Sequence, residues 1–165
     1  MNPPSTRLPN LSLDHVAVAV SSVEESAQIY VALGGRITAP EIIAHEGVRI
    51  SMIELGGSRI ELLEPVGKDS VIARFLTKHG PGIHHLALRV PVIEDVWADL
   101  RTRNVRLVSD SIQVGAGGHR YFFIHPESTG GVLIEIVGEA TADASTLARE
   151  LSQPAVLREG SGDRS

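Results

Sequence analysis

The chain of 165 residues contains no cysteine. This absence excludes a disulfide framework, a thiolate nucleophile, a zinc finger and an iron–sulfur cluster. Any bound metal ion must therefore be held by nitrogen and oxygen ligands. Aromatic residues are scarce, at 4% of the chain, which argues against a platform for stacking nucleic-acid bases. Basic residues are fewer than acidic ones, which gives a net charge of −5. A general nucleic-acid binder usually carries a net positive charge. We therefore expect no nucleic-acid partner.

Long hydrophobic runs are missing too. No stretch approaches the roughly 20 apolar residues that a membrane-spanning helix needs, and the first ten residues, MNPPSTRLPN, do not have the pattern of a secretory leader. We expect a cytoplasmic protein with no membrane partner and with a flexible arm over residues 1–11. The remaining composition, 42% hydrophobic and 21% charged, is sufficient for one packed domain.

An internal repeat is the most informative feature that is present. Residues 13–20 read LDHVAVAV and residues 83–90 read IHHLALRV, and both alternate in the manner of a β-strand. Each has histidine at its third position, which makes His15 and His85 counterparts. Each strand is followed by a helical pattern and then by further strands, so the chain consists of two similar halves.

The closing strand of each half carries the same signature. RIELLEP in the first half and LIEIVGE in the second place Glu61 and Glu135 in corresponding positions. We predict an α+β fold built from two pseudo-symmetric β-α-β-β-β modules. The predicted boundaries are a single domain over 12–138, with modules 12–66 and 82–138, a linker helix over 69–80, and a short helix and disordered tail over 139–165. The strands expected after the helix of each module are 36–43, 48–55 and 59–63, then 106–112, 120–124 and 131–137.

The repeat predicts a metal site made of four side chains. Two modules related by pseudo-symmetry would place His15, Glu61, His85 and Glu135 around one cavity. Two imidazoles and two carboxylates suit Co, Mn, Fe, Ni or Zn and leave coordination positions open for substrate or water. Two buried carboxylates are costly without compensation, and a divalent cation supplies it. Because a strand alternates its faces, we expect His85, and not its neighbour His84, to face the cavity.

On these residues the chain resembles the vicinal oxygen chelate superfamily, which includes glyoxalases, extradiol dioxygenases and bleomycin- or fosfomycin-resistance proteins. Within it, the chain is similar to the methylmalonyl-CoA epimerase family. The resemblance covers about residues 12–138 and is carried most specifically by LLEPVGKDSVIARFL followed by GIHH. It implies one curved mixed sheet around a metal site, as in glyoxalases. It also implies cobalt as the usual ion, with metal ligands at His15, Glu61, His85 and Glu135.

The resemblance further implies an activity and partners. Such an isomerase would interconvert (R)- and (S)-methylmalonyl-CoA by α-proton abstraction and enolate stabilisation, with an acyl-CoA as substrate. Glu135 is the first candidate for proton transfer, and the pseudo-symmetry nominates Glu61 for the opposite face. A homodimer is expected from the same resemblance. Two alternatives stay open: a glyoxalase-type lyase or isomerase acting on a glutathione hemithioacetal, and a non-enzymatic drug-binding resistance protein of the same fold.

The chain departs from the family pattern at two positions. Some epimerases carry a second carboxylate, proposed as an acid/base partner, where this chain has Ile50, and a turn often written His-Pro-Lys ends here in Glu127. Glu46 lies in a polar loop and is a lesser candidate for the second base, because a solvated loop is the simpler interpretation. An anionic CoA substrate also calls for a local basic patch against the global charge, and we expect Arg106 or Arg120 to contribute to it.

Overall fold

The computed structural model of the protein describes residues 11–115 and 118–138. The predicted helix and tail over 139–165 lie outside the described residues, as does the predicted arm except for Leu11. The first half contains β1 (Ser12–Ala19), α1 (Val23–Ala32), β2 (Arg36–Ile37), β3 (Glu41–Ile43), β4 (Val48–Leu55) and β5 (Ser58–Pro65). After α2 (Val71–His79), the second half contains β6 (Gly82–Val90), α3 (Ile93–Thr102), β7 (Gln113–Val114), β8 (Arg120–Ile124), a 3₁₀ turn (Pro126–Ser128) and β9 (Ile134–Gly138).

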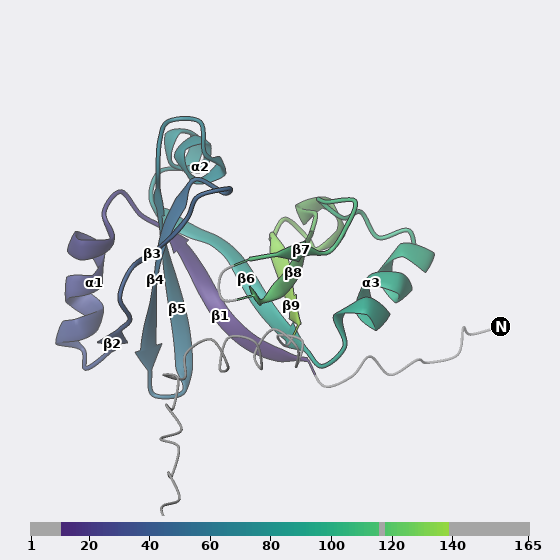
Figure 1. The fold of residues 1–165 in the computed structure, drawn as a ribbon, viewed down its shortest axis with the longest axis horizontal. Helices are drawn as coiled ribbons and strands as arrows, with labels where there is room; N and C mark the ends of the chain where they lie inside the picture. The colour runs from purple at the N-terminus through teal and green to yellow at the C-terminus, as the bar shows by residue number, and fades with distance from the viewer. Residues whose placement is uncertain (1–10, 116–117, 139–165) are drawn as a thin grey trace, which may run out of the picture.

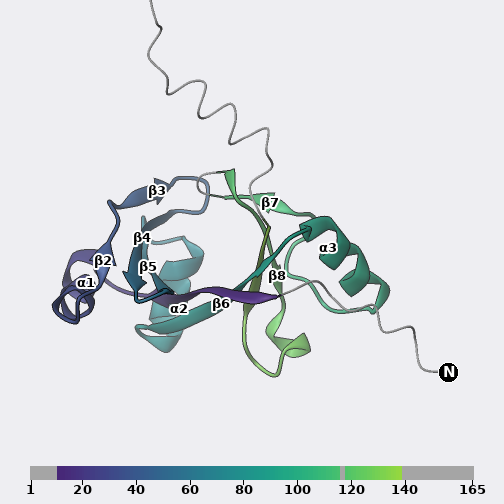
Figure 2. The ribbon, with the colours of Figure 1, turned by 90° about the horizontal axis from the view of Figure 1, so that it is seen from below.

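Within the described residues, the strands form one mixed sheet of nine strands, in the order β2-β4-β5-β1-β6-β9-β8-β7, with β3 paired to β4. At its centre β1 and β6 are antiparallel, while β1 is parallel to β5 and β6 is parallel to β9. Reading outward from the centre therefore gives the same arrangement in both halves (Figure 1). Figure 2 shows that the sheet curls, so that β4 and β3 rise on one side of the central strands and β8 and β7 on the other. This confirms the predicted α+β fold with one curved mixed sheet.

Local sequence signals mark the starts of two helices. The Ser22 hydroxyl accepts a hydrogen bond from the Glu25 amide at 3.2 Å and thereby caps α1. Ser70 caps the linker helix α2 in the same way through the Ala73 amide at 3.1 Å. The helix ends at Gly80, whose φ of 75° is a conformation that glycine adopts without steric cost.

Two predicted strands are wrong in extent. The strand predicted over 36–43 is divided into β2 and β3, because Pro40 between them has no amide hydrogen to donate to a ladder. The strand predicted over 106–112 is absent from the described residues. Leu107 makes one isolated bridge, to Ile124, and regular pairing with β8 begins only at β7. Residues 109–111 read Ser-Asp-Ser, and such side chains favour turns because they bind nearby backbone groups.

Two irregularities interrupt the central pair of strands. The register between β1 and β6 shifts at two places. One shift leaves Asp14 as an extra residue in β1, directly before His15, and the other leaves His84 as an extra residue in β6, directly before His85. A β-bulge of this kind re-aims the side chains around it. The two bulges occupy corresponding places in the two halves, next to the two repeated histidines.

The apolar core is divided among the three helices. One cluster joins α1 to β4 and β5, a second joins α2 to β1, β3, β4 and β5, and a third joins α3 to β6, β8 and β9. Phe122 of β8 is fully buried in the third cluster, where its ring lies 4.9 Å from that of Trp97 in α3. α1 and α3 pack on the face of the sheet opposite the cavity described below, whereas α2 packs on the cavity side and closes one end of it.

We expect Phe122→Ala to lower the free energy of unfolding by about 3–5 kcal/mol, because it removes a fully buried ring and leaves a cavity. Urea denaturation followed by circular dichroism measures this loss. Leu33→Ala is the matched control, since Leu33 is 73% exposed and its truncation should change stability by about 0.5 kcal/mol or less. Equal losses in the two variants would contradict the assignment of Phe122 to the core.

Candidate metal centre

A cavity of about 570 Å³ lies inside the curve of the sheet, a volume typical of small-molecule sites. Side chains from β1 and β6 form its base, and side chains from β4, β5, β8 and β9 form its walls. The N-terminal end of α2 and the loop before β4 also line it. The cavity therefore draws residues from both halves of the chain.

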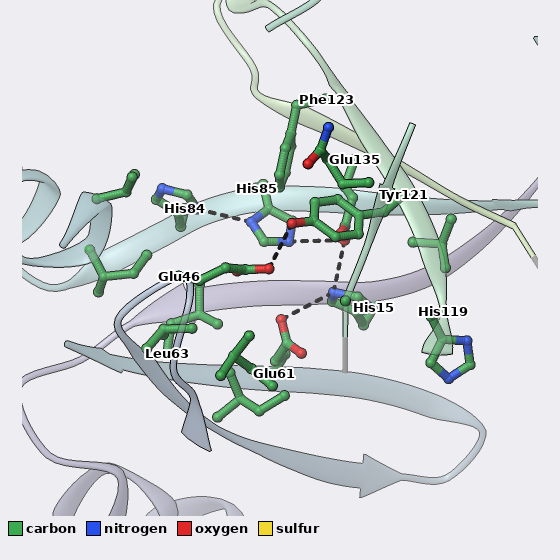
Figure 3. Close-up of a pocket in the computed structure, with 18 of the residues that line it drawn as sticks. His15, Glu46, Glu61, Leu63, His84, His85, His119, Tyr121, Phe123 and Glu135 are labelled. Atoms are coloured by element: carbon green, nitrogen blue, oxygen red, sulfur yellow. Dashed lines mark hydrogen bonds and ion pairs between the residues drawn. The ribbon is translucent and has the colours of Figure 1, made fainter. Parts of the chain in front are cut away.

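The side chains of the predicted metal site meet in this cavity (Figure 3). His15 comes from β1 and His85 from β6, while Glu61 and Glu135 come from the strands that pair in parallel with them. The Nε2 atom of His15 lies 3.4 Å from an oxygen of Glu61 and 3.5 Å from an oxygen of Glu135. The Nε2 atom of His85 lies 3.3 Å from the same Glu135 oxygen.

This group fits a divalent metal ion. Ligand atoms of His15, Glu61 and His85 lie within 4.8 Å of one another. Glu135 stands outside that mutually close group of three, but its contact with both Nε2 atoms places it at the same centre. The two Nε2 atoms are buried and have no hydrogen-bond partner among the described residues. Buried nitrogen lone pairs without a partner are costly, and a metal ion would satisfy both.

The outer nitrogen of His15 is bound to Asp14, which the sequence did not single out. Asp14 accepts a hydrogen bond from Nδ1 of His15 at 2.9 Å and forms ion pairs with Arg59 and Arg89. Burial alone would raise the pKa of Asp14, but the hydrogen bond to His15 and the two guanidinium groups hold it at about 2. Asp14 is therefore a buried carboxylate that stays ionised.

The same surroundings act on His15 itself. Burial by itself would lower the pKa of His15, but the hydrogen bond to Asp14 and the carboxylates of Glu61 and Glu135 outweigh burial and raise the pKa to about 9. Without a metal ion, His15 therefore carries a proton at neutral pH.

The expectation that His84 faces away from the cavity is wrong. Both His84 and His85 line the cavity, and their Nδ1 atoms are 2.9 Å apart. The bulge at His84 breaks the strict alternation on which the expectation was based. The His84 ring also packs against Phe75 of α2. Burial, followed by the neighbouring His85, lowers the pKa of His84 to about 4, so the ring is neutral near pH 7.

The two walls of the cavity differ in polarity. The wall from the first half presents Val48, Ile50 and Met52 from β4, which are apolar. The wall from the second half presents Tyr121 and Phe123 from β8. Ile50, which stands where some epimerases carry a carboxylate, therefore places an alkyl side chain in the cavity wall and supplies no acid/base group at that position.

A hydrogen bond connects the two halves over the cavity. The Tyr121 hydroxyl donates to the Glu46 carboxylate at 2.6 Å (Figure 3). Burial, followed by this hydrogen bond, raises the pKa of Tyr121, so the hydroxyl stays protonated. Glu46 thus has a defined partner in the cavity, which corrects its interpretation as part of a purely solvated loop.

The positive charges at the cavity are not the expected ones. Arg106 forms an ion pair with Glu127 and Arg120 forms one with Glu94, and neither arginine lines the cavity. The arginines that do line it lie in two different strands and one helix, so no local sequence pattern groups them. They are Arg59, Arg74 and Arg89.

Among the described residues, no helix is long and apolar enough to cross a membrane.

Known proteins share this sequence and fold. A family model described as the Glyoxalase/Bleomycin resistance protein/Dioxygenase superfamily matches residues 14–123. The chain is 37% identical over 126 residues to the mitochondrial methylmalonyl-CoA epimerase of Homo sapiens, covering 75% of this chain and 72% of that protein. The methylmalonyl-CoA epimerase structure from Mycobacterium tuberculosis is 38% identical, with a TM-score of 0.75 and coverage of 81% of this chain and 91% of that one. A methylmalonyl-CoA epimerase solved in complex with methylmalonyl-CoA and NH4+ is 32% identical, with a TM-score of 0.73 and coverage of 78% and 94%.

These matches span most of the described domain and agree with the paired halves of its sheet. The chain belongs to the glyoxalase/bleomycin resistance protein/dioxygenase superfamily and, within it, to the methylmalonyl-CoA epimerase family.

Proposed function

We propose that the protein is a metal-dependent isomerase that interconverts (R)- and (S)-methylmalonyl-CoA. The observation that carries this proposal is the convergence of two unpartnered histidine nitrogens and two carboxylates in one cavity of an epimerase-family chain. A glyoxalase would use a similar set of ligands, but the family relationship favours a malonyl thioester as substrate. A purely drug-binding protein of this fold has no need for such a polar cluster in its cavity.

The proposed metal ligands are His15, Glu61, His85 and Glu135. This set of two nitrogen and two carboxylate ligands is compatible with cobalt, which we propose from the family resemblance, and with Mn, Ni, Zn or Fe. When bound, a divalent ion would stabilise the negative charge that develops on the thioester and carboxylate oxygens of the substrate. The chain contributes by holding the ligands on central strands of the sheet, where His15 and His85 are 6% and 4% exposed.

Epimerisation moves a proton from one face of the substrate to the other. The C2 proton lies between two carbonyl groups, and its removal gives a planar intermediate that must be reprotonated on the opposite face. That requires a proton-transferring group on each side. Glu135 from the second half and Glu61 from the first half approach the centre from corresponding strands, and we assign the two proton transfers to them. Glu46, held by Tyr121, also lines the cavity.

The cavity walls support the proposed substrate. The apolar side chains of Val48, Ile50 and Met52 offer a surface for the methyl group. Arg59, Arg74 and Arg89 line the cavity and are the candidate contacts for an anionic thioester, although Arg59 and Arg89 also pair with Asp14. We further propose a homodimer in the cytoplasm, as the sequence and the family resemblance imply.

Separate substitutions of the two glutamates distinguish their roles. If each carboxylate serves one face, Glu135→Gln should block C2 deuterium exchange from one epimer and Glu61→Gln should block it from the other. Inversion needs both groups, so it should fall by about 10²-fold or more in each variant. NMR of deuterium incorporation at C2 in deuterated water, started from each pure epimer, measures both effects.

Metal content is measured on the same samples, because both glutamates are also proposed ligands. Glu64→Gln is the matched control, since Glu64 also lies in β5 but binds the Val23 amide and Arg49 rather than the cavity. It should exchange at the wild-type rate. A wild-type exchange rate from both epimers in Glu135→Gln would rule out its role as a base.

Removal of divalent metal is expected to abolish the activity. Dialysis of the protein against a chelator should eliminate C2 exchange, and one equivalent of Co²⁺ should restore it. Mg²⁺ should restore little, because it prefers a shell of oxygen ligands to imidazole. Elemental analysis and exchange rates are followed together. Full activity in protein with less than about a tenth of an equivalent of any divalent metal would contradict the proposal, since one ion per site is required.

Metal binding should compete with protons at His15. The folded metal-free protein holds a proton on this ring with a pKa of about 9, and a metal ion needs the neutral ring. The apparent affinity for Co²⁺ should therefore rise roughly tenfold per pH unit below pH 9 and level off above it. Calorimetry at pH 7.5 in two buffers of different ionisation enthalpy should show about one proton released per ion bound. An affinity that does not change between pH 7 and 8.5 would contradict this prediction.

A further inference from the structure

The bulge in β1 places a carboxylate directly behind one proposed metal ligand. Asp14 Oδ1 is 2.9 Å from Nδ1 of His15, and the two side chains are only 4% and 8% exposed. An ionised carboxylate can only accept, so the shared hydrogen belongs to Nδ1. In the neutral ring that a metal ion needs, the lone pair then lies on Nε2, the atom that faces Glu61 and Glu135. The contact therefore fixes both the orientation and the tautomer of the His15 ring.

Asp14 is itself held from two further strands. Arg59 of β5 and Arg89 of β6 both form ion pairs with its carboxylate. Arg59 Nε also donates to the Asp14 backbone oxygen at 3.3 Å. Hydrogen bonds from His15 and Arg59 and the ion pair with Arg89 thus surround one buried carboxylate, which restricts its rotation and compensates its charge. If Asp14 served only to accept a hydrogen bond from His15, two arginines would not be needed to hold its carboxylate.

The second half of the chain uses a bulge in a corresponding way. His84, the extra residue of β6, lies with its Nδ1 atom 2.9 Å from Nδ1 of His85. In both halves, the residue added by the bulge contacts the outer nitrogen of the histidine that follows it. The bulges therefore have a common consequence, which is to bring a hydrogen-bonding partner to the back of each inward-facing ring.

We propose that Asp14 is a positioning residue of the metal centre, which holds His15 with Nε2 directed at the metal ion and is itself held by Arg59 and Arg89. This inference rests on the metal site proposed above. It assigns no contact with the substrate to Asp14. Outer partners of ligand histidines typically change metal affinity by about 10–100-fold when they are lost.

The test is a calorimetric titration of the full-length, chelator-treated protein with Co²⁺. Asp14→Asn keeps the size of the side chain, but its single amide oxygen cannot serve the arginines and His15 together. We expect Co²⁺ affinity to fall by about 10–100-fold in this variant and in Asp14→Ala. Asp69→Asn, the same change at another cavity-lining carboxylate, should keep the wild-type affinity. Thermal melting by circular dichroism checks that each variant is folded.

A measurement on the unsubstituted protein does not depend on the stability of any variant. In protein labelled with ¹⁵N-histidine and loaded with Zn²⁺, NMR should show His15 protonated at Nδ1 and coordinated through Nε2. Coordination through Nδ1, or an unchanged Co²⁺ affinity in Asp14→Asn, would overturn the role of Asp14 but would not contradict the proposed metal site. Failure of the wild-type protein to bind either ion would overturn both proposals.

Discussion

The antiparallel pairing of β1 with β6 is the constraint on which the rest of the structure depends. These strands join the two halves and carry His15 and His85, whose ring centroids are 5.6 Å apart. Each strand also has a parallel partner that carries a glutamate, Glu61 in β5 and Glu135 in β9. The backbone ladder therefore fixes the spacing of the polar cluster. The spacing depends less on the rotamers of long side chains. A site built on rigid strands in this way is preorganised.

This arrangement requires polar groups to be buried at the centre of a sheet, where their desolvation is costly. The structure offsets the cost in two layers. In the inner layer, imidazole nitrogens face carboxylates within 3.5 Å. In the outer layer, Asp14 binds His15 and is balanced by Arg59 and Arg89. The apolar clusters under the three helices surround these layers, so that hydrophobic burial elsewhere stabilises a sheet whose centre is polar.

The features that sequence predicted well are those with a local or repeated signal. Strand alternation and the internal repeat predicted both halves of the sheet and predicted that the four polar side chains share one cavity. The bulges at Asp14 and His84 were missed because a register shift is a relation between two strands, and neither strand signals it alone. That is why His84 was placed on the wrong face. The contact of Glu46 with Tyr121 was also missed, since it depends on how closely the loop before β4 in the first half approaches β8 in the second.

The two halves have kept a common backbone but differ in chemistry, and the proposed reaction explains why both properties are useful. The proposed proton transfers on the two faces of a planar intermediate use carboxylates in equivalent positions, and Glu61 and Glu135 occupy such positions because β5 pairs with β1 as β9 pairs with β6. The substituents around the reacting carbon are all different, so the walls that contact them must differ as well. One wall carries Ile50 and Met52, and the other carries Tyr121 and Phe123. Symmetry in the strands therefore suits the chemistry at C2, while asymmetry in the side chains suits recognition of the groups attached to it.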